Sequence, residues 1–243
     1  MTYCVALNLD SGLVLLADTR TNAGIDNIST FRKMFTWAVP GERAIALLTS
    51  GNLAITQAVV SQLQERIDHP LDGVPTLLSA ATMFEAVQIV ANTMRDIQTR
   101  YGPGLAAMNE SALASIVVAG QRQGGVPRLF LVYSAGNFIE ATEDTPFFQI
   151  GETKYGKPII DQVLSTDLSL EAGVTLCLLS MASTMRSNLS VGMPLDVAVI
   201  PKDSFSFEQL RRIEPDNAAF WALAEAWSSK LRASFEAMRS HKV

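Results

Sequence analysis

Apolar and polar positions alternate along the start of the chain with the period of two that is typical of a β-strand. One face of this predicted strand carries Tyr3, Val5, Leu7 and Leu9, and the other carries Thr2, Cys4, Ala6 and Asn8. Asp10-Ser11-Gly12 is turn-forming, so residues 13–19 are predicted to return as the second strand of a hairpin. Both faces of this hairpin are largely apolar, which indicates a sheet that is covered on both sides.

Strands and helices are predicted in separate groups along the rest of the chain. Further strands are expected over residues 33–39, 43–49, 113–119, 128–134 and 195–200, with a short one near Phe138. Helical periodicity occupies residues 55–67, 77–94, 155–163 and 174–185, and the second of these helices is expected to end at a Gly102-Pro103-Gly104 loop. This order favours an α+β fold: a four-layer αββα sandwich, with helices on both outer faces of two packed sheets.

Residues 202–243 follow a different pattern and are predicted to be a C-terminal helical extension of a main domain over residues 1–201. Ser206–Ile213 is expected to be a short helix that is broken at Pro215. From Asp216 onward, one helical face carries Phe220, Leu223, Ala224, Trp227, Leu231, Phe235 and Met238. This face is expected either to dock on the domain or to contact a neighbouring subunit, and the sequence leaves both open.

Charge and composition exclude several classes of partner and cofactor. The net charge is −5 and no stretch is rich in Lys or Arg, so neither nucleic acid nor an anionic membrane surface is an expected partner. Cys4 and Cys177 lie in apolar runs, and with His69 and His241 they form no metal-ligand spacing, so neither a metal nor a cofactor is predicted. The absence of a long apolar run and of a basic leader makes the cytoplasm the expected compartment.

Thr2 becomes the N-terminal residue if aminopeptidase action removes Met1. Such a threonine carries a nucleophilic hydroxyl and a free α-amine, whose pKa of roughly 7.7–8.0 suits a base near neutrality. The amine can take the proton from the hydroxyl and later give it to a leaving amine. A threonine at the second position of the chain is equally compatible with an ordinary strand residue.

Two charged residues border predicted strands and could act on Thr2. Asp18 ends the second strand of the hairpin, which returns its carboxylate to the end of the sheet near Thr2. Lys33 begins the next apolar strand, and a lysine paired with Asp18 would place positive charge beside the Thr2 hydroxyl. Arg32 points to the opposite face of that strand, and Arg20 is an alternative partner for Asp18.

The segment Thr49-Ser50-Gly51-Asn52 joins a predicted strand to a predicted helix. Backbone N–H groups at such a junction have no helical partner and can hold an oxyanion. Gly51 would let a substrate approach the backbone closely.

The joint order of these features resembles the N-terminal-threonine hydrolases of the proteasome β-subunit family, and within it the bacterial Anbu ("ancestral β-subunit") branch. The resemblance covers residues 2–201. It is carried by the strings Ala17-Asp18-Thr19-Arg20-Thr21-Asn22-Ala23-Gly24, residues 27–37, Ser50-Gly51-Asn52-Leu53-Ala54 and the segment Ile150-Gly151-Glu152 to Tyr155-Gly156.

This resemblance implies a fold of the N-terminal nucleophile hydrolase type and a role for each matching residue. Thr2 aligns with the nucleophile, Asp18 with the carboxylate that orients the catalytic lysine, Lys33 with that lysine, and Gly51 with the oxyanion glycine. Ser190 aligns with a serine near the terminal amine. Residues expected to border the substrate are Arg20, Thr21, Asn22 and Ser50.

The chain departs from the family pattern in residues that are expected to surround the nucleophile. Ser187 stands where most relatives have Asp, and Val191 replaces a glycine. The segment Ile150-Gly151-Glu152 lacks the usual Gly-Ser-Gly, so the second active-site serine has no counterpart. These changes favour a weak or narrow peptidase activity.

The sequence therefore predicts a threonine-type peptidase or amidase that works within a ring or ring-like helical homo-oligomer. A non-catalytic scaffold subunit of the same kind of assembly and an amidase for a small metabolite are the alternatives. The substrate, the subunit number and any ATPase partner are left open by the sequence.

Overall fold

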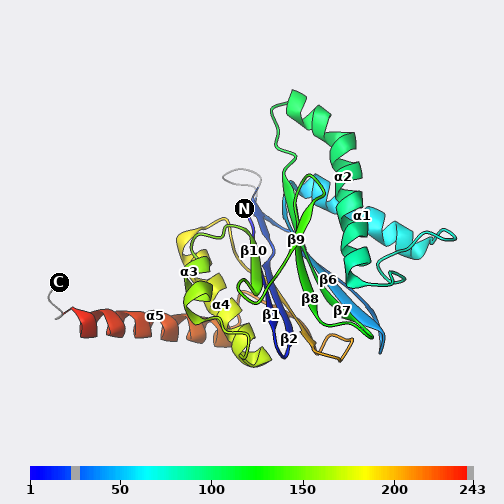
Figure 1. Cartoon of the computed structure of the whole chain (residues 1–243). Helices are drawn as coiled ribbons and strands as arrows, with labels where there is room; N and C mark the ends of the chain where they lie inside the picture. Colours follow the sequence, from blue (N-terminus) through cyan, green and yellow to red (C-terminus); the bar gives the residue numbers. More distant parts are fainter. Residues whose placement is uncertain (23–27, 240–243) are drawn as a thin grey trace.

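The computed structural model describes residues 1–22 and 28–239, and Figure 1 shows how their elements are arranged. Most of the strands form two five-stranded sheets, in which neighbouring strands are antiparallel. Together with the helices, these sheets confirm the α+β class.

The first sheet has the strand order β10-β1-β2-β11-β12 and contains the chain start. Its strands are β1 (Tyr3–Leu9), β2 (Gly12–Asp18), β10 (Phe147–Gly151), β11 (Leu195–Pro201) and β12 (Gln209–Ile213). The predicted hairpin of β1 and β2 is present, with Cys4 opposite Ala17 and Leu9 opposite Gly12. Because β10 and β2 flank β1 on its two sides, the first residues of the chain lie inside the sheet.

The second sheet has the order β5-β6-β7-β8-β9, and a separate two-stranded sheet pairs β3 with β4. The strands are β3 (Arg20–Asn22), β4 (Ile28–Thr30), β5 (Met34–Val39), β6 (Arg43–Gly51), β7 (Ala114–Arg122), β8 (Arg128–Val132) and β9 (Phe138–Glu140). The small sheet lies between β2 and β5 in the chain, so it borders both Asp18 and Lys33.

The helices are α1 (Leu53–Asp68), α2 (Met83–Ala107), α3 (Lys157–Val163), α4 (Leu170–Ser187) and α5 (Ala218–Met238). Short polar side chains cap them where the chain leaves a strand or loop. Asn52, Thr82, Ser169 and Asn217 each accept a hydrogen bond from a first-turn N–H, which satisfies a donor that the helix itself cannot pair.

Three buried apolar clusters hold these elements together. One joins α1 and α2 to the second sheet and includes Leu63, Val87 and Phe130. Another joins α3 and α4 to the first sheet through residues such as Leu7 and Leu178. The third is made by strand residues of both sheets, among them Leu15, Leu48, Val117 and Ile200. The first two clusters therefore each join helices to one sheet, and the third contains residues of both sheets.

Two of the predicted elements were wrong, and the strands β3, β4 and β10 were not predicted. Helix α2 runs through Gly102-Pro103-Gly104 to Ala107, because the missing proline N–H costs one hydrogen bond near the helix end while Leu105 still packs on the core. Residues 209–213, predicted to be helical, form strand β12 along β11. Strand β10 was not predicted, although its pairing places Gly151 opposite Tyr3.

Helix α5 is anchored at its start and extends away from the rest of the molecule (Figure 1). Phe220 is buried in the cluster around α4, and Arg186 donates a hydrogen bond to the Ser228 hydroxyl at 3.1 Å. Farther along, Leu231, Phe235 and Met238 are exposed. Docking on the domain therefore accounts for only the first part of the helix.

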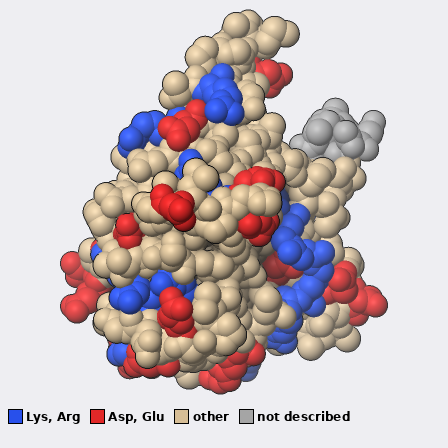
Figure 2. Space-filling view, turned by 90° about the vertical axis from the view of Figure 1, so that its right-hand side faces the viewer, with Lys and Arg blue, Asp and Glu red and all other residues tan. Residues whose placement is uncertain are grey.

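Acidic and basic side chains alternate over the face shown in Figure 2, where groups of Lys and Arg adjoin Asp and Glu. None of the helices in residues 1–22 and 28–239 has the length and apolar character needed to span a membrane.

Candidate active site

Thr2 precedes β1 and is held by the neighbouring strand. The Glu152 N–H donates to the Thr2 carbonyl oxygen at 2.6 Å, and Thr2 is only 8% exposed. Gly151 makes this close approach possible, because a Cβ at this position would lie 2.0 Å from the same oxygen. The backbone of the predicted nucleophile is therefore fixed by the first sheet.

Asp18 and Lys33 form a buried ion pair next to Thr2, as the sequence predicted. Lys33 Nζ lies 2.7 Å from Asp18 Oδ1, and the two residues are 4% and 0% exposed. Asp18 also accepts the N–H of Tyr3 at 3.0 Å and that of Gly192 at 3.3 Å. Burial raises the pKa of the Asp18 carboxyl above its ordinary value, and the Lys33 ammonium opposes that rise.

The Lys33 ammonium makes two further hydrogen bonds, and one of them reaches the chain start. Nζ donates to the Arg20 carbonyl oxygen at 2.6 Å and to the Met1 carbonyl oxygen at 3.3 Å. The pKa of the Met1 α-amine is lowered by burial and by the Lys33 charge, against a smaller opposite effect of Asp18. With Met1 in place, the nitrogen of Thr2 is an amide and Lys33 has three acceptors for its three N–H groups.

The loop after α4 packs next to the Asp18–Lys33 pair. Arg20 donates to the Leu189 carbonyl oxygen at 2.9 Å and packs against Gly192, where a Cβ would lie 2.3 Å from the guanidinium carbon. Ser190 is half-buried, and its N–H donates to Asn188 Oδ1 at 2.9 Å. The loop that carries Ser190 is thus held next to Asp18, through Gly192, and next to Arg20.

Gly51 ends β6 and presents its backbone to solvent, immediately before the cap of α1. Its φ of +103° is one that residues with a side chain rarely adopt, and a Cβ there would lie 2.2 Å from the Leu113 carbonyl oxygen. Ser50 beside it is half-buried. This position requires glycine on conformational and steric grounds, whatever its role in chemistry.

Three of the residues predicted to border the substrate, Arg20, Thr21 and Asn22, lie on β3. Thr21 is half-buried, and its hydroxyl has no hydrogen-bond partner among the described residues. Asn22 pairs with Ile28 through the backbone, and its side chain lies outside the described part, as does the whole of Ala23. Thr21 Oγ1 is therefore a buried polar atom without a partner among the described residues.

Glu152 was not predicted as a site residue. It is 8% exposed, and its Oε2 accepts a hydrogen bond from Asn188 Nδ2 at 3.1 Å. Its backbone bond to Thr2 places it in the same group as the predicted residues. The sequence offered one signal, the lack of a serine at this position, but the contact with Thr2 depends on the unpredicted strand β10.

Other candidates lie away from this group or lack reactivity. Cys4 is fully buried, and burial raises the pKa of its thiol, which disfavours the nucleophilic thiolate. Within residues 1–22 and 28–239, no group of three or more His, Cys, Asp or Glu side chains is placed to hold a metal ion.

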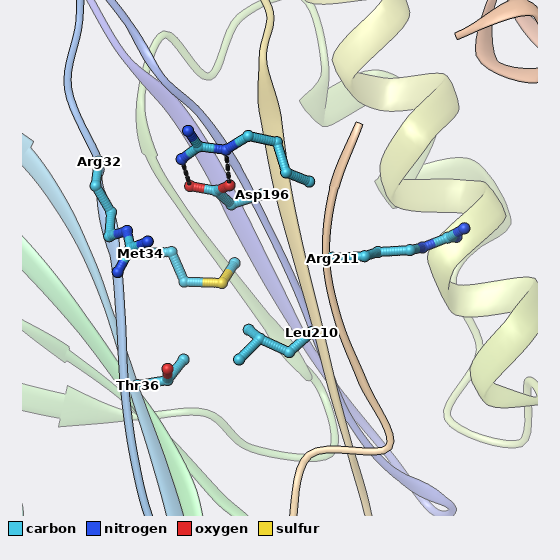
Figure 3. Close-up of a pocket in the computed structure, with 7 residues that line it drawn as sticks. Arg32, Met34, Thr36, Asp196, Leu210 and Arg211 are labelled. Carbon is cyan, nitrogen blue, oxygen red and sulfur yellow. Dashed lines mark hydrogen bonds and ion pairs between the residues drawn. The ribbon is translucent and has the colours of Figure 1, made fainter. Parts of the chain in front are cut away.

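Arg32 lines a hollow on the other side of the chain from the Lys33–Asp18 pair. This hollow, of about 160 Å³, lies between β5 and β12, with Met34 and Leu210 pointing into it and the Arg212–Asp196 ion pair at one end (Figure 3). Lys33, one residue along the chain, instead bonds to Asp18. The prediction that Arg32 faces away from the site is confirmed.

Comparison with known proteins agrees with this fold. The family model for "Proteasome subunit" matches residues 2–200, so the chain belongs to the proteasome subunit family.

Among solved structures, the chain is similar to Anbu proteins over its whole length. It is 46% identical to an Anbu (Gly-1) mutant from Hyphomicrobium sp. strain MC1, with a TM-score of 0.92 and 100% of both chains covered. Anbu (ancestral beta-subunit) from Yersinia bercovieri is 46% identical, with a TM-score of 0.92 and 99% of each chain covered.

A third similar structure is described as a helical assembly of the Anbu complex from Pseudomonas aeruginosa. It is 47% identical, with a TM-score of 0.92 and with 99% of this chain and 98% of that one covered. The comparison with curated proteins gave no match.

Proposed function

We propose that the protein is a threonine-type N-terminal nucleophile hydrolase of peptide or amide bonds, which acts within a self-assembled oligomer. The observation that carries this proposal is the buried Asp18–Lys33 pair, whose ammonium reaches the backbone just before Thr2. A charged pair in this position is costly to bury and has no evident use in packing. It suits a site in which a hydroxyl must be converted into a nucleophile.

Removal of Met1 prepares the site in two ways. It frees the α-amine of Thr2, and it removes one of the three acceptors of Lys33 Nζ, which leaves an N–H directed toward Thr2. Burial and the Lys33 charge, which lower the pKa of the Met1 amine, are expected to act in the same direction on the amine of Thr2. A neutral amine next to a positive charge is the arrangement that a base beside a developing alkoxide needs.

The proposed reaction proceeds in two steps. The Thr2 amine takes the proton of the Thr2 hydroxyl, and the oxygen attacks the substrate carbonyl while the Gly51 N–H stabilises the resulting oxyanion. The amine then returns the proton to the leaving nitrogen as the C–N bond breaks, which leaves an ester on Thr2. Water, deprotonated by the same amine, hydrolyses this ester and restores the hydroxyl. Arg20, Thr21, Asn22 and Ser50 are proposed to border the substrate, and Ser190 to lie near the amine.

We also propose the finer architecture and the assembly. The three apolar clusters support a four-layer αββα sandwich, because they separate helices, two sheets and helices in that order. Residues 202–243 are proposed to act as an extension whose exposed apolar residues on α5 contact another copy of the chain. The helical assembly described for the relative from Pseudomonas aeruginosa supports self-association. The buried free thiols of Cys4 and Cys177 support the cytoplasm as the compartment.

Intact mass spectrometry tests the catalytic proposal most directly. The purified protein would be weighed before and after treatment with an epoxyketone or a β-lactone, two electrophiles that trap N-terminal threonines. We expect loss of Met1 and a single adduct, and we expect no adduct in Thr2→Ala. A chain that retains Met1, or a processed chain that resists both reagents, would contradict the proposal and favour a non-catalytic scaffold subunit.

A further inference from the structure

Glu152 is the charged residue next to Thr2 that the proposed reaction does not use. Its backbone N–H lies 2.6 Å from the Thr2 carbonyl oxygen, and the register of β1 with β10, which pairs Tyr3 with Gly151, brings Thr2 and Glu152 opposite each other. Gly151 excludes any side chain between them. The backbone of Glu152 is therefore fixed next to the backbone of Thr2.

The carboxylate of Glu152 is buried, oriented and incompletely satisfied. Oε2 accepts from Asn188 Nδ2 at 3.1 Å, and Oε1 accepts from the Lys154 N–H at 3.4 Å. A carboxylate can accept about four hydrogen bonds, so capacity remains on both oxygens. Asn188 is itself fixed, because it caps the C-terminal end of α4 and accepts the Ser190 N–H.

The other charged groups around Thr2 are already committed. Asp18 uses one oxygen for Lys33 and Tyr3 and the other for Gly192. The Arg20 guanidinium donates to the Leu189 carbonyl oxygen. Asp18 is thus paired with Lys33, whereas Glu152, whose backbone contacts Thr2, forms no ion pair with a described residue.

We propose that Glu152 is a positioning residue for the nucleophile: its carboxylate, held by Asn188, stabilises and orients the α-amine that processing exposes on Thr2. This inference rests on the proposed function. Lys33 and burial favour the neutral amine, whereas Glu152 and Asp18 favour the protonated form. The amine must hold a proton after it has taken one from the hydroxyl, so a negative charge opposite Thr2 aids that step and counteracts Lys33.

The test compares the wild-type protein with Glu152→Gln, Glu152→Asp and Glu110→Gln. The Gln variant removes the charge and keeps the shape and an acceptor for Asn188, whereas the Asp variant keeps the charge. Glu110 is exposed, follows α2 and takes no part in the site, so Glu110→Gln controls for the change in net charge. The rate of Thr2 labelling by a β-lactone would be measured by intact mass across the pH range.

In Glu152→Gln we expect the acidic limb of the labelling profile to move to lower pH by about one unit, because loss of a carboxylate lowers the pKa of a neighbouring ammonium. The labelling rate on the plateau should fall several-fold, since a weaker base activates the hydroxyl less well. Glu152→Asp should retain the acidic limb of the wild type, and Glu110→Gln should match the wild type throughout.

A Glu152→Gln profile that superimposes on the wild-type profile would overturn the inference and leave the proposed function standing. A lower thermal midpoint in this variant with an unmoved acidic limb would also overturn it, since the residue would then be structural. If the wild type loses Met1 and still takes no label, the proposed function itself fails, and this inference fails with it.

Discussion

At the scale of single residues, Asp18 and Lys33 depend on each other for their place in the interior. Burial raises the pKa of the Asp18 carboxyl, so this group contributes stability below its unfolded pKa and loses that contribution as the pH rises through the folded pKa. The Lys33 ammonium, whose Nζ lies 2.7 Å from Asp18 Oδ1, offsets part of the cost of burying the carboxylate.

Removing one member of the pair is expected to destabilise the protein more than removing both. Asp18→Asn leaves the Lys33 charge buried without its counter-ion and should lower the free energy of unfolding by about 3–5 kcal/mol. Adding Lys33→Met should restore most of this loss, because no charge then remains buried. Urea denaturation at neutral pH would measure both variants. Equal stability of the single and the double variant would show that the two charges are not coupled. In a separate labelling experiment, both variants should lose Thr2 labelling.

At the scale of whole elements, α5 combines a docked start with an exposed apolar end. Leu231 is 51% exposed and Phe235 65% exposed, on a helix that extends away from the sheets. Large apolar side chains on such a surface lower the free energy of association when a partner covers them.

The variant Leu231→Glu/Phe235→Glu should therefore reduce the size of the assembly and leave the thermal midpoint of the subunit unchanged. Ala233→Glu adds a charge on the opposite face of the helix, and it should assemble as the wild type does. Light scattering after gel filtration measures the size of each. An unchanged size in the double variant would place the subunit contact elsewhere.

The elements also show which parts of the fold the sequence could predict. Strongly apolar strands and the hairpin of β1 and β2 were predicted correctly, because burial on both faces leaves a clear pattern. Strand β12 was taken for a helix because it is an edge strand with exposed Leu210, Arg211 and Arg212, and such strands lack an apolar face. Its place is set by pairing with β11, which no local pattern encodes.

The site residues also divide into those that the sequence could predict and those that it could not. Thr2, Asp18 and Lys33 lie at the ends of predictable strands, so a hairpin and one following strand suffice to bring them together. Glu152 lies far along the chain and reaches Thr2 through β10, a strand of five residues that follows a loop. Its role depends on a long-range register, and the sequence alone could only indicate that the usual serine was missing.

At the scale of the molecule, the two proposed roles occupy separate places. Thr2 lies at the end of the first sheet, and the outer part of α5 extends away on the far side of α3 and α4 (Figure 1). The chemistry and the assembly should therefore be separable by mutation.

Thr2→Ala is expected to abolish labelling and to assemble as the wild type does. Alanine is small enough to fit the buried position and to permit removal of Met1, and the contact of the backbone carbonyl with Glu152 is retained. Analytical ultracentrifugation of this variant beside the wild type gives the comparison. An assembly that dissociates would assign Thr2 a structural role.

The hydrogen bond from Lys33 to the Met1 carbonyl oxygen bears on when Met1 can be removed. Aminopeptidases need an extended, accessible chain end, whereas the bond between Met1 and Thr2 runs into a sheet where Thr2 is almost fully buried. We therefore expect removal of Met1 to be faster from the unfolded chain than from the folded one, and a folded molecule that keeps Met1 to take no label. If folding is faster than trimming, we expect the purified protein to contain both processed and unprocessed chains, in proportions set by the two rates.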